Sequence, residues 1–546
     1  MKRVFNSKIV MIEIMFLIIS IFLNSNIING NITIGHDYLF HTSNLISSMN
    51  NFSVFKPNVF FYGMNCGFGY GSGIFYPPLS YKITSLIGLI LKLVNINPMY
   101  GISVFEILIT FLSATTMFVF IKRIFNKNDI SFLGAVSYIS TPYFLSDIYI
   151  RTSLAELLTF VFVPIVCLSI YELANNENKK FYILFVFGYT GMILSHFIIT
   201  IYLTIFIVII LTINYKNFFK LEKIKILSFA SIITLLIVSP YLLNIIEHKL
   251  VSNYVFFNEN LMYNLQYFKF NIIDLFIKNN TPGHFDSVLV HANYITLFLV
   301  IITLITRRKT LKDHSNLFIN CLILLIIILI LMQLNNLWDF VPEIFKLIQF
   351  PFRFCIFLSI LISLLVGNFL NLFDKYRKTI TIVLSLLIII VSFLSIKNIP
   401  SQKPNDKKLS MDYLFDYLPI KSMINKDYYL NRNNNIIVKK GKAVISNYIN
   451  NKQNIYGNIK LITDKVTLEL PRFYYLGYSI KLIDENNKSE SIKYTENKNG
   501  FINITIKKSG LLIVEYKRTL PNLIATIISI VVIIVNILYF CKILKR

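Results

Sequence analysis

Long apolar runs recur along most of the chain, and each is near the length of a membrane crossing. A helix that crosses a bilayer needs about 20 mainly apolar residues. Runs of this kind occupy 9–28, 100–121, 130–148, 153–173, 181–197, 198–214, 226–246, 292–306, 315–334, 352–373, 379–396 and 522–541. The pattern predicts a mainly α-helical, polytopic membrane protein with about twelve transmembrane helices.

One further apolar run, 79–94, is short and follows the pair Pro77-Pro78. Cytoplasmic loops of membrane proteins are enriched in Lys and Arg. If 79–94 does not cross, and the N-terminus is cytoplasmic, the basic clusters all fall on the cytoplasmic side: 122–123, 179–180, 216–225, 307–312, 375–378 and 542–546. We therefore expect 79–94 to be an interfacial helix, with both termini cytoplasmic.

After residue 396 the period of the pattern changes. Apolar and polar residues alternate in 465–470, 501–506 and 512–516, and Asn, Gly and Lys turns separate these segments. Such alternation is typical of half-buried strands. The chain therefore divides into a transmembrane domain (1–396) whose first external loop is 29–99, a small extracytoplasmic β-rich domain (397–521), and a last transmembrane helix with a cytoplasmic tail (522–546).

Composition and charge narrow the class of protein. A hydrophobic content of 55% and a mean hydropathy of +0.62 exclude a soluble protein. The net charge of +25 does not indicate nucleic acid, because cytoplasmic loops collect Lys and Arg for insertion alone. Residues 397–520, however, carry 22 Lys and Arg against 11 Asp and Glu. This surplus suits an anionic envelope polymer or lipid, or it reflects a Lys- and Asn-rich composition.

The polar and aromatic stretch 35–81 interrupts the apolar first half of the chain and holds the first candidate chemistry. Asp37 follows His36 and precedes His41 by four residues, a spacing that places Asp37 and His41 on one face of a helix. A carboxylate and an imidazole on one face can act as a general base with its orienting partner, or ligate a divalent metal. The alternative is an N-terminal cap with solvated histidines. Aromatic residues of the same stretch, among them Tyr76, can stack on sugars or anchor at the membrane interface.

Charged residues near the ends of other spans complete the candidate site. Arg151 and Glu156 flank the start of the run 153–173, and Arg353 opens the run 352–373. An arginine at headgroup depth binds phosphate oxygens bidentately; an ion pair between Arg151 and Glu156, or interfacial anchoring of Arg353, are the alternatives. His196 lies at the junction of two runs, on the same predicted side as Asp37, and is either a buried structural histidine or part of the site.

Six motifs, taken together and in order, resemble bacterial YfhO-like membrane proteins, which include chains labelled 6-pyruvoyl-tetrahydropterin synthase-related. The motifs are GHDYLFH (35–41), GYGSGIFYPPL (69–79), IRTSLAE (150–156), LSH (194–196), QFPFRF (349–354) and PRFYYLGY (471–478). These proteins are similar to the GT-C glycosyltransferase superfamily. The resemblance implies a polyprenyl-phosphate-linked sugar as donor and an extracytoplasmic active site on the first external loop, in the plasma membrane of a bacterium.

By this resemblance Asp37 is the base or a metal ligand, and Arg151 and Arg353 hold the lipid phosphate. Some superfamily members carry two adjacent acids, but the neighbour of Asp37 here is His36, so a divalent metal is possible rather than implied. The function expected is sugar transfer to an envelope acceptor. A lipid-linked saccharide flippase and a non-catalytic assembly protein are the alternatives; clustering of ionisable residues near the outer ends of the spans favours transfer.

Overall fold

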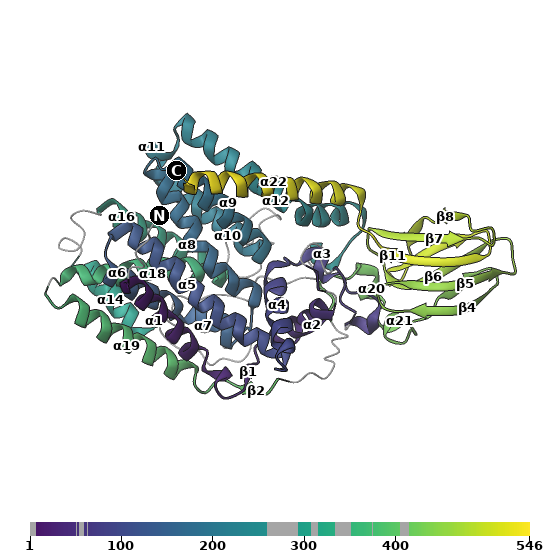
Figure 1. Cartoon of the computed structure of the whole chain (residues 1–546), viewed down its shortest axis with the longest axis horizontal. Coiled ribbons are helices and arrows are strands. Elements are labelled where there is room, and N and C mark those ends of the chain that lie inside the picture. The colour runs from purple at the N-terminus through teal and green to yellow at the C-terminus, as the bar shows by residue number, and fades with distance from the viewer. Residues whose placement is uncertain are drawn as a thin grey trace.

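A helical body makes up most of the molecule, and two small β-sheets project from one end of it (Figure 1). The computed structural model describes residues 7–50, 52–53, 59–62, 64–258, 293–306, 315–333, 351–373, 375–404 and 414–545. The helices are α1 Ser7–Leu23, α2 Tyr38–Asn50, α3 Ser72–Phe75, α4 Leu79–Leu93, α5 Gly101–Phe125, α6 Asn128–Ile139, α7 Pro142–Tyr149, α8 Leu154–Ala174, α9 Asn178–Ser195, α10 Phe197–Ile213, α11 Tyr215–Phe218, α12 Leu221–Val251, α14 Tyr294–Ile305, α16 Ser315–Gln333, α18 Cys355–Phe369, α19 Arg377–Ile396, α20 Ile420–Ile424, α21 Lys426–Leu430 and α22 Leu520–Lys545.

Within the described residues, six helices are long and apolar enough to cross a membrane. They are Pro98–Phe125, Leu154–Ala174, Leu221–Val251, Phe352–Leu372, Arg377–Ile396 and Leu520–Lys542. The prediction of about twelve spans is not confirmed, because several apolar runs form shorter helices. The run 130–148, for example, is broken into α6, of 12 residues, and α7, of 8 residues. Pro142 begins α7, where its missing N–H costs nothing.

The six long helices differ in how much of their surface is buried inside the protein. In α8, which is apolar on all sides, 89% of the residues are buried inside the protein. In α12 and α22 only 22% and 17% are buried, so both helices leave apolar side chains on the outside, as lipid-facing helices do. Figure 1 shows α22 returning from the sheets along α12. Asn522 donates to Asn244 Oδ1 across this helix pair at 2.9 Å.

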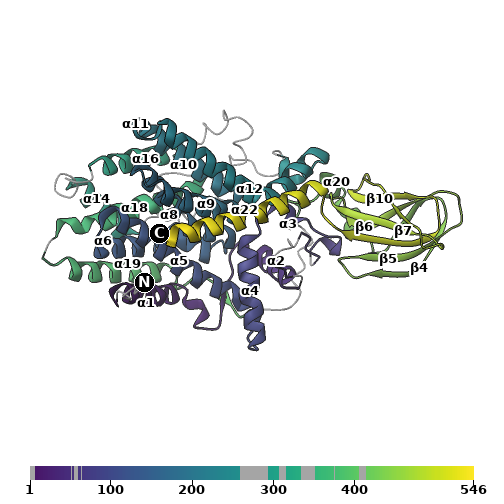
Figure 2. The ribbon, with the colours of Figure 1, turned by 45° about the horizontal axis from the view of Figure 1, so that its top comes forward.

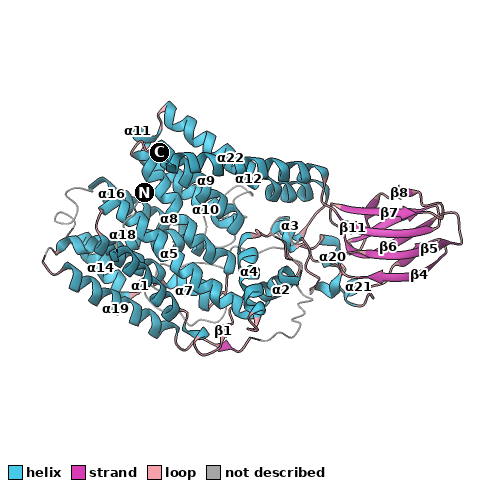
Figure 3. Ribbon diagram, in the orientation of Figure 1, coloured by secondary structure: helices cyan, strands magenta, loops and turns pink. Residues whose placement is uncertain are grey.

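The two sheets confirm the predicted strands. One has four strands in the order β3-β6-β10-β9 and the other has five in the order β4-β5-β11-β7-β8, all in antiparallel pairs; Figure 3 shows them as the magenta region. The alternating segments of the sequence form β6, β10 and β11. The strands are β3 Ile437–Lys440, β4 Ala443–Asn450, β5 Ile455–Leu461, β6 Val466–Phe473, β7 Tyr478–Ile483, β8 Ser489–Ser491, β9 Tyr494–Glu496, β10 Phe501–Ile506 and β11 Gly510–Tyr516; β1 Ile32–Thr33 pairs separately with β2 Ser401–Gln402.

The sheets share one hydrophobic core with the loop that leads from α2 to α3. Phe60, Phe68 and Tyr70 belong to the same buried cluster as the inward side chains of β6, β7, β10 and β11. The Phe473 N–H donates to the Phe68 carbonyl at 3.2 Å, and the Phe60 ring stacks on Tyr478 with centroids 5.4 Å apart. The loop is therefore held between the sheets and the helical body (Figure 1, Figure 2). The β-rich region is packed on the rest of the protein, rather than only tethered by the last helix.

Helix α4 contains 15 residues, fewer than a membrane crossing needs. Its interfacial placement, expected for 79–94, stays a prediction. Together α2, α3 and α4 lie between the sheets and the long helices (Figure 1), and all of the candidate chemistry adjoins them.

Candidate functional site

Two motifs that are far apart in the sequence run side by side at the start of α2. The Gly35 N–H donates to Thr152 Oγ1 at 2.8 Å. The N–H groups of His36 and Asp37 donate to the carbonyls of Ile150 and Arg151, each at 2.9 Å. A Cβ at position 35 would lie 2.5 Å from the backbone carbon of Arg151, so only glycine permits this approach. The pairing fixes Asp37 beside the segment that carries Arg151.

The side chain of Arg151 belongs to a buried group of charges, called here the arginine cluster: Arg151, Arg353, Glu156 and Asp147. Arg151 Nη1 donates to Glu156 Oε2 at 2.8 Å and to Asp147 Oδ1 at 3.0 Å. Arg353 Nε donates to the same Glu156 oxygen at 3.3 Å, and the exposed fraction of all four residues is 7% or less. Each cation is thus paired with a carboxylate, as buried charges require.

Glu156 is the residue that joins the two arginines. It lies in the first turn of α8, where the positive end of the helix dipole favours a carboxylate. The Tyr143 hydroxyl donates to its other oxygen, Oε1. Arg151 makes these bonds through Nη1 alone, and within the described chain its remaining N–H groups have no partner. Arg151 therefore keeps donors with which an anionic ligand can pair.

His196 caps α10 from the edge of this cluster. Its Nδ1 accepts the N–H of Ile199 at 3.2 Å. Because Nδ1 is an acceptor, the ring proton of the neutral imidazole is on Nε2. The residue is buried, and its ring centroid lies 6.4 Å from that of Tyr76. His196 is both a structural cap and a neighbour of the site.

Asp37 differs from the other acids of the site because its carboxylate is unpaired. It is partly exposed at the N-terminal end of α2, and within the described part of the chain its side chain accepts no hydrogen bond and makes no ion pair. Its negative charge nevertheless affects neighbouring groups: it favours a higher pKa for His41, Tyr76 and Asp416. His36, the neighbour of Asp37, is exposed.

The imidazole of His41 is not bonded to the carboxylate of Asp37, which was its expected partner; the two residues share only a backbone hydrogen bond, from the His41 N–H to the Asp37 carbonyl at 2.9 Å. Its Nδ1 lies 2.7 Å from the Tyr81 hydroxyl, and the same hydroxyl accepts from Asn44 Nδ2 at 2.8 Å. The tautomer of His41 with its proton on Nε2 lets Nδ1 accept the Tyr81 hydroxyl proton. Burial lowers the pKa of His41 to about 4, against the opposing effect of Asp37. The imidazole is neutral at physiological pH and positions the site rather than carrying charge.

Tyr76 stands at the centre of the aromatic residues around Asp37. Its ring centroid lies 6.2 Å from that of His41 and 5.7 Å from that of Tyr81. Burial, together with the negative charge of Asp37, raises the pKa of the Tyr76 hydroxyl. The ring centroid of Tyr417, from the segment that leads into the sheets, lies 6.4 Å from that of Tyr76.

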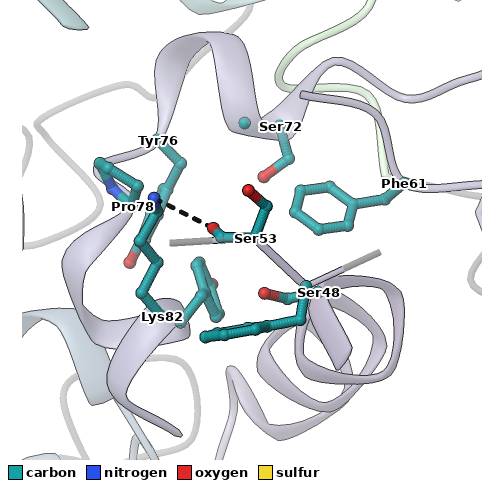
Figure 4. Close-up of a pocket in the computed structure, with 10 residues that line it drawn as sticks. Ser48, Ser53, Phe61, Ser72, Tyr76, Pro78 and Lys82 are labelled. Atoms are coloured by element: carbon teal, nitrogen blue, oxygen red, sulfur yellow. Dashed lines mark hydrogen bonds between the residues drawn. The ribbon is translucent and has the colours of Figure 1, made fainter. Parts of the chain in front are cut away.

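Tyr76 and Tyr81 also line a pocket between α2, α3 and α4 (Figure 4). The other lining residues are Ser48, Phe52, Ser53, Phe61, Ser72, Gly73, Pro78 and Lys82. Lys82 Nζ donates to the Ser53 carbonyl at 3.4 Å, which is the dashed line in Figure 4.

The described residues do not fit a metal site. Among them, no three His, Cys, Asp or Glu side chains lie close enough to hold an ion, and His41, one of the ligands expected from sequence, is bound to Tyr81 instead.

Several residues of the site were not among those expected from the sequence. Asp147 is an acid within an apolar run, four residues before Arg151, and this spacing was a usable signal. Asp416 had no comparable signal, because it reaches the site only through the tertiary fold. Burial and then the charge of Asp37 raise the pKa of Asp416. Tyr81 and Asn44 are ordinary helix residues in the sequence.

Comparison with known proteins gives one relative. Over 340 residues the chain is 26% identical to an uncharacterized protein of Lactococcus lactis subsp. cremoris (strain MG1363), a match that covers 59% of this chain and 53% of that protein. The matched region thus spans about half the length of the curated relative. No family model matches the chain, and no solved structure matches it.

Proposed function

We propose that the protein is a membrane glycosyltransferase that transfers a sugar from a polyprenyl-phosphate donor to an envelope acceptor. One observation carries the proposal. Backbone pairing holds the unpaired carboxylate of Asp37 beside the segment of Arg151, and buried carboxylates already hold the side chains of Arg151 and Arg353 in place. A general base and a preorganised cation site are the two groups that sugar transfer from a phosphate requires.

In the proposed reaction, Asp37 takes the proton from the acceptor hydroxyl as that oxygen attacks the anomeric carbon. The bond from the anomeric carbon to the phosphate oxygen breaks, and the lipid phosphate leaves with the electron pair. In this proposal the free donors of Arg151 and the Nε2–H of His196 receive that negative charge. Glu156 holds Arg151 and Arg353 in place, so little reorganisation accompanies the reaction.

The arrangement of the chain supports an outer active face. Both termini lie in the helical body, away from the sheets (Figure 1, Figure 2), and the site lies on the side of the body nearest the sheets. With the termini cytoplasmic, as the Lys and Arg pattern predicts, the proposed site faces the outside of a bacterial plasma membrane. A polyprenyl tail is then accommodated by the apolar helices. The basic surplus of residues 397–520 supports an anionic polymer or lipid as acceptor.

The test is replacement of Asp37 by Asn in cells, with Asp464→Asn as the matched control. Asp464 is exposed, in the turn before β6, so the control makes the same chemical change away from the site. We expect Asp37→Asn to abolish envelope glycosylation at normal protein level, with the control unaffected. Glycosylation retained in Asp37→Asn rejects the proposed role.

A lipid-linked saccharide flippase is the second candidate, favoured by the depth of the arginine cluster. Buried ionisable residues and interrupted helices mark substrate pathways in transporters. Here Glu156 is fully buried, and the chain breaks at His196 between α9 and α10. Movement of the lipid-linked sugar across proteoliposomes without formation of a glycosylated product would favour this alternative.

A further inference from the structure

Glu106 is a buried acid that lies outside the arginine cluster. It belongs to α5, within one of the six helices long enough to cross a membrane, and it is 2% exposed. Its Oε1 has no hydrogen-bond partner, and Glu106 makes no ion pair within the described part of the chain. A buried carboxylate without a partner is costly, and an ionisable residue inside a spanning helix usually marks a functional site.

Further oxygen atoms without partners occur where α1 packs against α5. Asn24, directly after α1, donates from Nδ2 to Thr110 Oγ1 at 3.1 Å, and Thr110 follows Glu106 by one helical turn. Ser113 continues the same face of α5. The Oδ1 of Asn24 and the Oγ of Ser113 have no partner among the described atoms. All three side chains are 3% exposed or less, so this polar face is closed to bulk water.

The C-terminal end of α1 makes the surroundings of Glu106 more negative. The last carbonyls of a helix carry the negative end of its dipole, and α1 ends at Leu23. The Tyr149 hydroxyl, from the end of α7, donates to the Leu23 carbonyl at 2.5 Å. Burial and then the charge of Glu106 raise the pKa of that hydroxyl, so Glu106 acts on the group that joins α7 to α1. A carboxylate at a helix C-terminus is unfavourable unless a positive charge joins it.

We propose that Glu106, Asn24 and Ser113 form a binding site for a small monovalent cation such as Na⁺, at the C-terminal end of α1. Carboxylate, amide and hydroxyl oxygens are ligands that hard cations prefer, and one carboxylate balances one positive charge. Helix C-terminal ends within a membrane hold Na⁺ in transporters in the same way. Such a site is distinct from a centre built of three or more acids, histidines or cysteines, which the described residues do not form.

The position of this site gives the cation a structural consequence. Tyr149 directly precedes Ile150, whose carbonyl accepts the His36 N–H at 2.9 Å. A cation at Glu106 would therefore stabilise the packing of α1, α5 and α7 next to the backbone pairing that holds Asp37. The inference is independent of sugar transfer, because it concerns ion binding alone and its test needs no donor or acceptor.

Thermal unfolding of the full chain in nanodiscs tests the site. It is measured in NaCl and in N-methyl-D-glucamine chloride at equal ionic strength, so that charge screening is the same in both salts. An ion that binds only the folded chain raises its stability, and we expect unfolding about 2 °C or more higher in NaCl. Glu106→Gln, which keeps the shape of the side chain, should lose this difference.

Glu13→Gln is the matched control. Glu13 is also a glutamate between α1 and α5, but it has a partner, since it accepts from Thr115 Oγ1 at 2.7 Å. We expect this variant to keep the response to Na⁺. Equal unfolding temperatures of the wild type in the two salts, or an equal response of the wild type and Glu106→Gln to Na⁺, overturns the proposal.

Modification of the unmutated chain by dicyclohexylcarbodiimide provides a second measurement. The reagent attacks protonated carboxyl groups in apolar surroundings, and a bound cation displaces the proton that it needs. We expect Na⁺ to protect Glu106, as followed by mass spectrometry, and to leave the modification of Glu13 unchanged. Modification of Glu106 to the same extent in both salts would show that its carboxyl takes up only a proton, and would overturn the assignment of a cation.

Discussion

Replacement of Gly35 by Ala tests how the site is assembled. The added Cβ would lie 2.5 Å from the backbone carbon of Arg151, 2.6 Å from the Ile150 oxygen and 2.6 Å from the Thr152 nitrogen. All three atoms belong to the backbone, so no side chain can rotate away. Carbon atoms pack at about 3.5–4.0 Å, and relief therefore requires the two segments to separate by about 1 Å.

That separation breaks the bonds from His36 and Asp37 to the carbonyls of Ile150 and Arg151, which are 2.9 Å long. Two lost hydrogen bonds at about 1 kcal/mol each, with a further overpacking cost of about 1 kcal/mol or more, give a loss of about 2–4 kcal/mol. A shift of about 1 Å in a catalytic group lowers a rate about 100-fold. We expect Gly35→Ala to lower both thermal stability and sugar transfer.

The assays are thermal unfolding of the detergent-solubilised full chain and envelope glycosylation in cells. Gly457→Ala is the matched control, since a Cβ at Gly457 in β5 would meet its nearest atoms at 3.7 Å, an ordinary contact. We expect this control to keep wild-type stability and activity. A Gly35→Ala variant with wild-type stability and activity would refute the close pairing of 35–37 with 150–152.

Three further predictions concern stability. Tyr81→Phe removes the hydroxyl shared by His41 and Asn44, and we expect a loss of about 2 kcal/mol or more from the buried groups left unpaired; unchanged thermal unfolding would contradict this. Folding lowers the pKa of His41 from 6.5 to about 4, so between these pH values the unfolded chain binds a proton that the folded chain does not. Stability should therefore fall as the pH drops from about 6.5 to about 4. His41→Gln should reduce the slope of stability against pH. Burial opposes ionisation of Glu469, but hydrogen bonds led by that from Arg432 outweigh it and lower the pKa of the carboxyl; this contribution is present at neutral pH and lost as the pH falls below the ordinary value of 4.5. Glu469→Gln should cost about 3–5 kcal/mol at pH 7 by leaving Arg432 buried and unpaired, and less at low pH; an equal cost at both pH values would contradict the ion pair.

Much of the fold could be predicted from local pattern. Alternation located β6, β10 and β11, and apolar runs located α5, α8, α12, α18, α19 and α22. The break between α6 and α7 was missed, because the run 130–148 is apolar throughout although Pro142 was a signal. The period of the apolar pattern and its hydropathy carry local information. They therefore predicted individual helices and strands better than the number of helices that cross the membrane.

The assembly of the site was less predictable, because its contacts are long-range. The sequence identified Asp37, Arg151 and Arg353 as candidates, but could not show that Glu156 joins both arginines. Nor could spacing show that His41 bonds to Tyr81 rather than to Asp37, although the i,i+4 spacing allowed either outcome. Partner choice among buried polar groups is set by tertiary packing.

The most direct test of the proposed function is turnover by the purified protein in vitro. The full chain, reconstituted in nanodiscs, is given a polyprenyl-phosphate donor with a radiolabelled sugar and an isolated envelope fraction, and the label in polymer or lipid is counted. We predict labelling by the wild type and by Asp464→Asn, and at least about a 100-fold lower rate for Asp37→Asn, the usual contribution of a general base. Equal labelling by Asp37→Asn and the wild type, or no wild-type labelling with any donor sugar, would contradict the proposal.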